Sequence, residues 1–129
     1  FPPAQSGTIW TKYIGEEIKT SPAISGNRAI VTTSGGKILS MSLSNGEILW
    51  KSELPNKEIP NSPTIVNDTI FLSTNKSPVT DKSYIRAYDL KTGNLKWNTE
   101  ITDAGTDSIA FANGTLYLTT ENGVIYAVD

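Results

Sequence analysis

The sequence predicts an all-β fold made of three four-stranded antiparallel repeats. Three observations support this prediction: tryptophans recur at positions 10, 50 and 97, short apolar segments recur at matching offsets from them, and pairs of turn-forming residues separate these segments. A period of about 40 residues is typical of repeat architectures. The chain has 129 residues, which is long enough to bury a core without disulfides or structural metals.

Each repeat contains four apolar segments, and their positions define the expected strands. Polar and apolar residues alternate in the fourth segments, so that Leu95 and Trp97 share one face of a strand. The first segments are 21–24, 62–65 and 108–111; the second are 29–31, 70–72 and 116–118; the third are 37–41, 84–88 and 124–128; the fourth are 7–10, 46–50 and 93–97.

Turn-forming pairs join these segments into hairpins. Gly26-Asn27, Asn67-Asp68 and Asn113-Gly114 separate the first and second segments, and such pairs tolerate the positive φ of two-residue loops. No stretch of helical periodicity lies between the segments, so four antiparallel strands form a meander in each repeat. Residues 75–83 replace a tight turn in the second repeat, and we expect them to form a protruding loop.

The second segments predict how the sheets pack. Residues 70–72 and 116–118 are apolar at consecutive positions, which indicates strands covered on both faces. Sheets that stack in this way are the blades of a β-propeller, and a lone β-sandwich is the alternative. We therefore expect one domain, 1–129, with repeats at about 20–53, 61–100 and 107–129, in which an N-terminal strand at 6–13 completes a sheet.

The stretch from 87 to 97 carries a specific motif. Its pattern, Ala87-x-Asp89-x-x-Thr92-Gly93-x-x-x-Trp97, resembles the tryptophan-docking motif of the quinoprotein (pyrroloquinoline-quinone-like) β-propeller repeats. The resemblance covers nearly the whole chain after residue 6. The copy at 40–50 retains only the glycine and the tryptophan of the motif, and the third copy stops at 129.

The resemblance implies a structural role for the motif residues. In the family, each indole packs on the alanine position of its motif and against the Thr-Gly peptide of an adjoining blade. Carried over, Trp97 would cover Ala87, and Trp50 would cover Ser40 and reach the Thr92-Gly93 turn. The expected docking residues are Trp10, Trp50, Trp97, Ala87, Asp89, Thr92, Gly93 and Gly46.

Composition limits the chemistry. The chain has no Cys and no His, which removes disulfides, thiolate nucleophiles, imidazole bases and the common zinc sites. Asp103, Asp107 and Glu121 lack the spacing of a calcium loop, and for Asp89 and Asp129 we favour turn hydrogen bonds over metal ligation. The chain also lacks the adjacent-cysteine pair that is common at the cofactor of the resembled dehydrogenases.

These observations favour a non-catalytic structural or protein-interaction propeller with no cofactor and no metal site. The alternative is an excised part of a larger quinoprotein-like propeller, either a binding scaffold or a dehydrogenase. The expected partners are other copies of the chain, the remaining blades of a larger propeller, or other proteins. With a net charge of −2 and no long apolar run, we expect neither nucleic-acid binding nor membrane insertion.

The sequence also suggests a location. The lack of cysteine, the Ser/Thr/Asn-rich pattern and the start at Phe1-Pro2-Pro3 without an initiator Met favour a processed chain or an excised piece that is extracellular, on the cell surface or periplasmic. Asn67, Asn113 and Asn75 stand in sequons and are candidate glycosylation sites.

The two ends of the chain have complementary patterns. The third repeat reaches its third strand at Asp129, whereas residues 7–12 have the pattern of a fourth strand. Pairing them within one chain requires a ring of three blades, which is tighter than usual. We instead expect Gly7–Lys12 to complete a sheet of another copy, in a closed ring or a filament. The chain should then be unstable as a monomer, and deletion of residues 1–12 should abolish its assembly.

Overall fold

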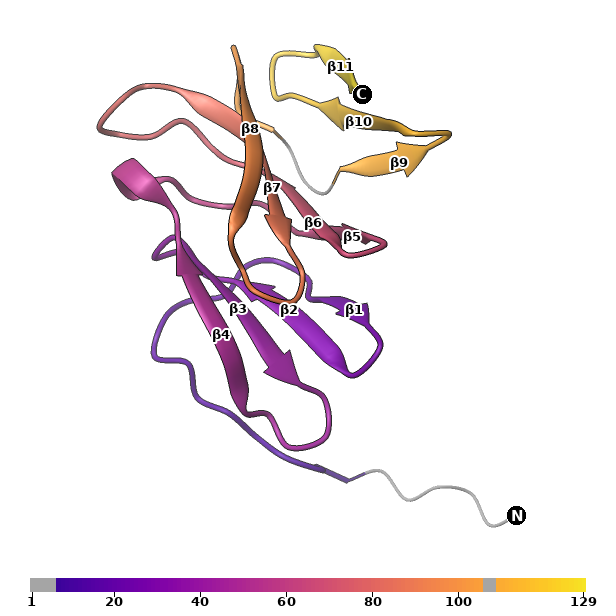
Figure 1. Ribbon diagram of the computed structural model, residues 1–129. Helices are drawn as coiled ribbons and strands as arrows, with labels where there is room; N and C mark the ends of the chain where they lie inside the picture. The colour runs from indigo at the N-terminus through magenta and orange to yellow at the C-terminus, as the bar shows by residue number, and fades with distance from the viewer. Residues whose placement is uncertain (1–6, 106–108) are drawn as a thin grey trace.

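The computed structural model describes residues 7–105 and 109–129, which form three antiparallel sheets. Figure 1 shows the sheets stacked in chain order, each beside the next. This arrangement confirms the predicted all-β class and the propeller-like blades. The first sheet contains β1 (Ala23–Ser25), β2 (Arg28–Thr32), β3 (Lys37–Ser42) and β4 (Ile48–Glu53); the second contains β5 (Thr64–Val66), β6 (Thr69–Ser73), β7 (Ser83–Asp89) and β8 (Leu95–Ile101); the third contains β9 (Ala110–Ala112), β10 (Thr115–Thr119) and β11 (Ile125–Val128).

The strands follow one another as meanders joined by tight turns. The first hairpin of each sheet closes with two residues between paired strands, and the turn residues Gly26, Asn67 and Asn113 have φ of 56°, 54° and 52°. Glycine and asparagine adopt this left-handed region more readily than other residues, which explains their recurrence there. In the described part of the chain the only helix is the short 3₁₀ turn η1 (Pro55–Lys57), and no helix could span a bilayer.

Two apolar cores hold the stack together. The core between the first and second sheets contains Ile30, Ile38, Leu54, Ile70, Leu72, Tyr88 and Leu90. The core between the second and third sheets contains Ile85, Ile101, Ile109, Leu116 and Leu118, with Phe71 and Trp97 packed against it.

The consecutive apolar residues of the second segments are explained by these two cores. In β6, Ile70 faces the first core and Phe71 faces the second. The ring centroids of Phe71 and Trp97 are 5.9 Å apart. Burial in the first core raises the pKa of Tyr88 to about 12. The middle sheet is therefore covered on both faces, as the pattern predicted.

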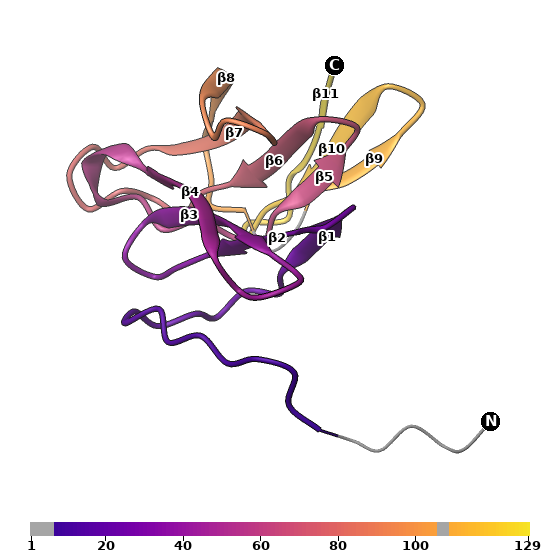
Figure 2. The same cartoon turned by 60° about the horizontal axis from the view of Figure 1, so that its bottom comes forward.

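The N-terminal segment differs from the expected strand. Within the described residues, 7–22 contribute no strand to any sheet, and the third sheet has three strands. Figures 1 and 2 show this segment running along the outside of the first sheet, at the opposite end of the stack from β9–β11. Because the second sheet separates these two ends, the segment cannot reach β11, and a three-bladed ring within one chain does not form.

The loop between β6 and β7 is anchored at its base. The Ser77 hydroxyl donates to the backbone carbonyl of Asn56 and accepts hydrogen bonds from the backbone N–H groups of Val79 and Thr80, at 3.1 and 3.2 Å. Asn75 N–H donates to the carbonyl of Ile59 over 2.9 Å. The loop thus packs on the link between the first two sheets while Val79, 60% exposed, points to solvent.

A buried ion pair lies at the same joint. Nε of Arg86 donates to Oε1 of Glu58 over 2.8 Å, and its Nη2 donates to Oε2 over 2.7 Å. The side chains are 6% and 0% exposed, and the guanidinium lies 4.5 Å from the ring centroid of Tyr84. This two-fold contact connects the link after β4 to strand β7 of the next sheet.

We expect Glu58→Gln to lower the free energy of unfolding by about 3–5 kcal/mol, because it leaves the buried guanidinium without its countercharge. Urea melts monitored by circular dichroism provide the measurement. The control is Glu100→Gln, which removes an exposed pair with Lys82 at 3.2 Å and should have little effect because solvent screens the pair. Equal losses in the two variants would show that burial adds nothing to the Glu58 pair.

Candidate functional site: the joints between sheets

The joint between the first two sheets is centred on Trp50. Its indole Nε1 donates to the backbone carbonyl of Leu90 over 2.9 Å, and its ring lies over Gly93 in the β7–β8 turn. Two strands away in the same sheet, the Arg28 guanidinium also reaches the Leu90 carbonyl, at 3.4 Å. The Ser52 hydroxyl donates to the Gly93 carbonyl over 2.5 Å. Side chains of the first sheet therefore bind the backbone of a turn in the second.

Trp10 makes the same contact one sheet earlier. Its Nε1 donates to the carbonyl of Leu43 over 2.8 Å, and its ring lies over Gly46 in the β3–β4 turn. Leu43 and Leu90 occupy matching positions in their turns, as do Gly46 and Gly93. Trp10 of the N-terminal segment therefore occupies the same place on the first sheet that Trp50 of β4 occupies on the second.

The turn glycines are required by this geometry. Gly46 and Gly93 have φ of 76° and 77°, where only glycine is unstrained. A Cβ on Gly93 would also lie 2.5 Å from Cε3 of Trp50, and a Cβ on Gly46 would lie 2.7 Å from the same atom of Trp10. The indole rings pack directly on the peptide backbone because no side chain intervenes.

Asp89 organises the turn on which Trp50 rests. Its Oδ1 accepts hydrogen bonds from the backbone N–H groups of Lys91 and Thr92, at 2.8 and 3.0 Å. These bonds, that from Thr92 foremost, lower the pKa of the Asp89 carboxyl. The Leu90 N–H donates to the Asp68 carbonyl over 2.9 Å, which holds in place the residue whose carbonyl receives the indole hydrogen bond.

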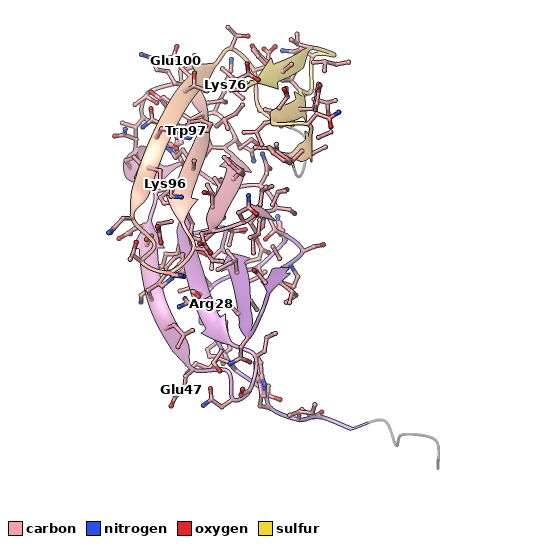
Figure 3. The ribbon with its side chains drawn as sticks, turned by 45° about the vertical axis from the view of Figure 1, so that its right-hand side comes forward. Arg28, Glu47, Lys76, Lys96, Trp97 and Glu100 are labelled. Atoms are coloured by element: carbon pink, nitrogen blue, oxygen red, sulfur yellow. The ribbon has the colours of Figure 1, made fainter. Side chains whose placement is uncertain are left out.

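Trp97 occupies the same position on β8 that Trp50 occupies on β4. It stands opposite Ala87 on the neighbouring strand, as Trp50 stands opposite Ser40, and both small residues are fully buried. Figure 3 shows Trp97 between Lys96 and Glu100 along β8. Within the described residues its indole N–H makes no hydrogen bond, and Trp97 is partly exposed.

A carboxylate recurs near the end of the segment that leads into each sheet, and the sequence did not reveal this recurrence. Glu16, Glu58 and Asp103 occupy matching places. The residues that follow them, Glu17, Ile59 and Ala104, each accept a backbone hydrogen bond from the residue two positions after the second strand of the next sheet. Glu58 binds Arg86, as described above.

The other two carboxylates have different partners. Glu16 accepts a hydrogen bond from the Thr33 hydroxyl at 3.0 Å and pairs with Lys37, and the hydrogen bond from Lys37 lowers the pKa of Glu16. Asp103 accepts from Nδ2 of Asn122 at 2.7 Å. In the sequence, an acidic residue follows each tryptophan after a short interval. The repetition is hard to recognise because the interval varies and the partners of the three carboxylates differ.

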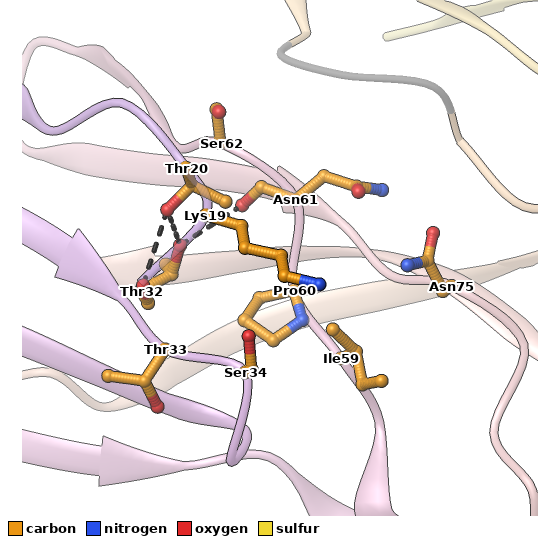
Figure 4. A pocket seen from close by; sticks show the side chains of 10 residues that line it. All are labelled: Lys19, Thr20, Thr32, Thr33, Ser34, Ile59, Pro60, Asn61, Ser62 and Asn75. Atoms are coloured by element: carbon orange, nitrogen blue, oxygen red, sulfur yellow. Dashed lines mark hydrogen bonds between the residues drawn. The ribbon is translucent and has the colours of Figure 1, made fainter. Parts of the chain in front are cut away.

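A polar pocket opens on the seam between the first two sheets. Figure 4 shows it beside the ends of β2 and β6, and its volume is about 230 Å³. Several of its polar groups already have partners: the Thr20 and Thr32 hydroxyls are 2.6 Å apart, and Nδ2 of Asn61 donates to the Ser73 hydroxyl, outside the lining, at 2.9 Å. The lining residues are Lys19, Thr20, Thr32, Thr33, Ser34, Ile59, Pro60, Asn61, Ser62 and Asn75.

The remaining predicted positions lie apart from one another. Asn67 and Asn113 are exposed in hairpin turns, and Asn75 lines the polar pocket. Their glycosylation stays a prediction. Asp129 accepts a hydrogen bond from the Thr115 hydroxyl over 3.1 Å, whereas Asp107 lies outside the described residues. No group of three or more acidic, Cys or His side chains in the described chain could hold a metal ion.

We expect Gly93→Ala to destabilise the fold by about 2–4 kcal/mol, because it adds both positive-φ strain and a clash with the Trp50 ring. The matched control is Gly26→Ala, which has a positive φ but no atom within 4 Å of the added Cβ and should cost about 1 kcal/mol. Chemical denaturation of both variants gives the two values. Equal losses would mean that the ring yields freely.

Replacement of the indoles by phenyl rings separates packing from hydrogen bonding. Trp50→Phe should cost about 1 kcal/mol more than Trp97→Phe, because only Trp50 donates a hydrogen bond, and its loss leaves the Leu90 carbonyl with the longer 3.4 Å contact to Arg28 alone. Thermal melts of the two variants at one protein concentration test this difference. A larger loss for Trp97→Phe would contradict it.

Comparisons with known proteins agree with this architecture. A family model described as outer membrane protein assembly factor BamB matches residues 1–129. The comparison with curated proteins found no match. Among solved structures, BamB from Moraxella catarrhalis is similar with a TM-score of 0.75 and 21% identity, over 94% of this chain and 36% of that chain.

Quinoprotein enzymes share the fold. Quinohemoprotein alcohol dehydrogenase ADHIIG from Pseudomonas putida has a TM-score of 0.67 and 16% identity, over 79% of this chain and 20% of that chain; the enzyme from Comamonas testosteroni has the same TM-score and 18% identity, over 79% and 21%. The chain thus spans about a third or less of the length of these structures. The resemblance of the chain to the pyrroloquinoline-quinone-like β-propeller repeats is confirmed, and the chain belongs to the outer membrane protein assembly factor BamB family of β-propeller repeats.

Proposed function

We propose that this chain is a non-catalytic propeller module that acts through protein–protein contacts in outer-membrane protein assembly, at the periplasmic side of that membrane. The family supports the class of function. The observation that carries the proposal is the outward face of the third sheet, where two apolar side chains remain exposed: Tyr117 is 43% and Ile125 71% exposed. Exposed apolar surface on a rigid sheet is typical of a protein-binding face.

The recurrent side chains support a structural use of the motif. Trp10, Trp50 and Asp89 all form hydrogen bonds with backbone groups of turns, and each of the repeated carboxylates accepts a hydrogen bond from a strand or turn of the sheet that follows it. We propose on this basis that Trp10, Trp50 and Trp97 dock sheets onto one another, with Ala87, Asp89, Thr92, Gly93 and Gly46 shaping their seats.

The partners that we propose are unfolded outer-membrane β-barrel chains and further blades, either of a second copy or of a larger propeller. The test is fluorescence anisotropy with a labelled, urea-released outer-membrane β-barrel chain. Saturable binding is expected, and Tyr117→Asp combined with Ile125→Asp should weaken it at least tenfold. An unfolded chain from a water-soluble α-helical protein is the control, and equal binding of both chains would contradict the proposal.

A quinone dehydrogenase role is the second candidate, since the fold is shared with quinohemoprotein alcohol dehydrogenases. Absorbance and fluorescence titration with pyrroloquinoline quinone and calcium distinguishes the two functions. We expect no saturable change. Binding in the micromolar range would overturn the non-catalytic assignment.

A further inference from the structure

The polar pocket on the seam between the first two sheets lies where Pro60 takes the place that a glycine has at the next joint. Pro60 and Gly105 match, because each forms an isolated antiparallel bridge with the residue after the second strand of its own sheet, Thr74 or Thr120. Gly105 packs directly on the preceding sheet, since a Cβ there would lie 2.3 Å from Oγ of Ser73. A proline ring cannot approach the first sheet as closely, which leaves room for the pocket at this joint.

Some polar atoms on the pocket wall have no hydrogen-bond partner among the described residues. The Asn75 side-chain amide makes no hydrogen bond there. Nδ2 of Asn61 donates to the Ser73 hydroxyl at 2.9 Å and to the Gly105 carbonyl at 3.2 Å, but its Oδ1 accepts nothing. The Ser62 hydroxyl accepts a backbone N–H at 3.3 Å and donates to no described group. The wall therefore offers both donors and acceptors to a ligand.

The charge at the pocket is balanced. Lys19 is the charged residue of the lining, and its Nζ lies 3.4 Å from Oε1 of Glu17. Figure 4 shows the Lys19 side chain extending toward Asn75 across the pocket. An anion that approached the ammonium would also approach the Glu17 carboxylate, so the pocket favours an uncharged ligand.

The unpaired atoms specify what such a ligand must offer. The side-chain oxygens of Asn61 and Asn75 need donors, whereas the Asn75 NH₂, the Ser62 hydroxyl and the Lys19 ammonium need acceptors. A carboxylate or phosphate only accepts, and it would leave the two amide oxygens unpaired. Hydroxyl groups both donate and accept, so a ligand with several hydroxyls on one ring satisfies both sets.

The apolar part of the wall and the size of the pocket agree with a sugar ring. Ile59, 40% exposed, and Pro60 provide an apolar surface for the C–H groups of such a ring. The pocket volume is about 230 Å³. A cavity of about 150 Å³ holds benzene, and pockets for drug-sized ligands begin at about 300 Å³. The pocket therefore suits one six-membered ring with its substituents.

We propose that this pocket binds a neutral sugar, either free or as one residue of a glycan. The ring packs on Ile59 and Pro60, and its hydroxyls form hydrogen bonds with Asn61, Asn75 and Lys19. This site goes beyond the protein contacts of the proposed function and lies on a different part of the molecule, so that neither depends on the other.

The first test is a nuclear magnetic resonance titration of the ¹⁵N-labelled chain with glucose, mannose and N-acetylglucosamine. At least one of these sugars should produce saturable shift changes centred on residues 59–62 and 75. Glucuronate, an anion of the same size, should bind more weakly. A disaccharide of the bound sugar distinguishes the two sources, since tighter binding than the monosaccharide indicates a glycan residue and equal affinity indicates a free sugar.

The second test uses variants of the pocket wall. Asn75→Leu keeps the size of the side chain but removes a donor and an acceptor, and it should weaken binding by about tenfold or more. Asn94→Leu, at an exposed position of the β7–β8 turn, is the matched control and should bind as the parent does. Lys19→Gln keeps a donor without the charge and should change the affinity little. Circular dichroism melts of each variant check that the fold is retained.

Shift changes that stay linear with concentration for all three sugars would overturn the proposal. So would equal losses in the two asparagine variants, or tighter binding of glucuronate that Lys19→Gln abolishes, because the latter would identify an anion site. None of these results bears on the binding of unfolded β-barrel chains, which is measured separately.

Discussion

The contact of an indole with a glycine turn is the interaction on which this stack depends. It combines a hydrogen bond to a carbonyl, 2.9 Å long between Trp50 and Leu90, with ring packing on the peptide of Gly93. A side chain at that glycine would hold the sheets apart. The same contact therefore sets both the separation of the two sheets and the position of one along the other, and the apolar cores fill the space that it defines.

The sequence predicted those parts of the fold that are encoded locally. Gly26-Asn27 and Asn113-Gly114 specify their own turns through backbone preference, and consecutive apolar residues at 70–72 indicate cover on both faces whatever supplies it. The pairing of Trp97 with Ala87 also follows from the tight turn between them, since a short loop fixes the register.

The rest could not be read from the chain because it depends on partners distant in sequence. Residues 7–12 have the pattern of a strand, but a strand requires an edge within reach, and the second sheet stands in between. The carboxylates of Glu16, Glu58 and Asp103 share one place at the joints, yet lysine, arginine and asparagine partners hide the repetition. The residues around each carboxylate do not indicate which distant residue it binds.

The three sheets are covered by neighbouring segments to different extents. Each sheet contacts only its neighbours, so stability accumulates joint by joint as in other repeat proteins. The middle sheet is buried on both faces, with Ile70 and Ile85 each fully inaccessible, and the N-terminal segment covers one side of the first sheet through Trp10 and Glu16. The third sheet has one neighbour and three strands. The sheet that packing supports least is therefore also the one whose exposed face is proposed to bind a partner.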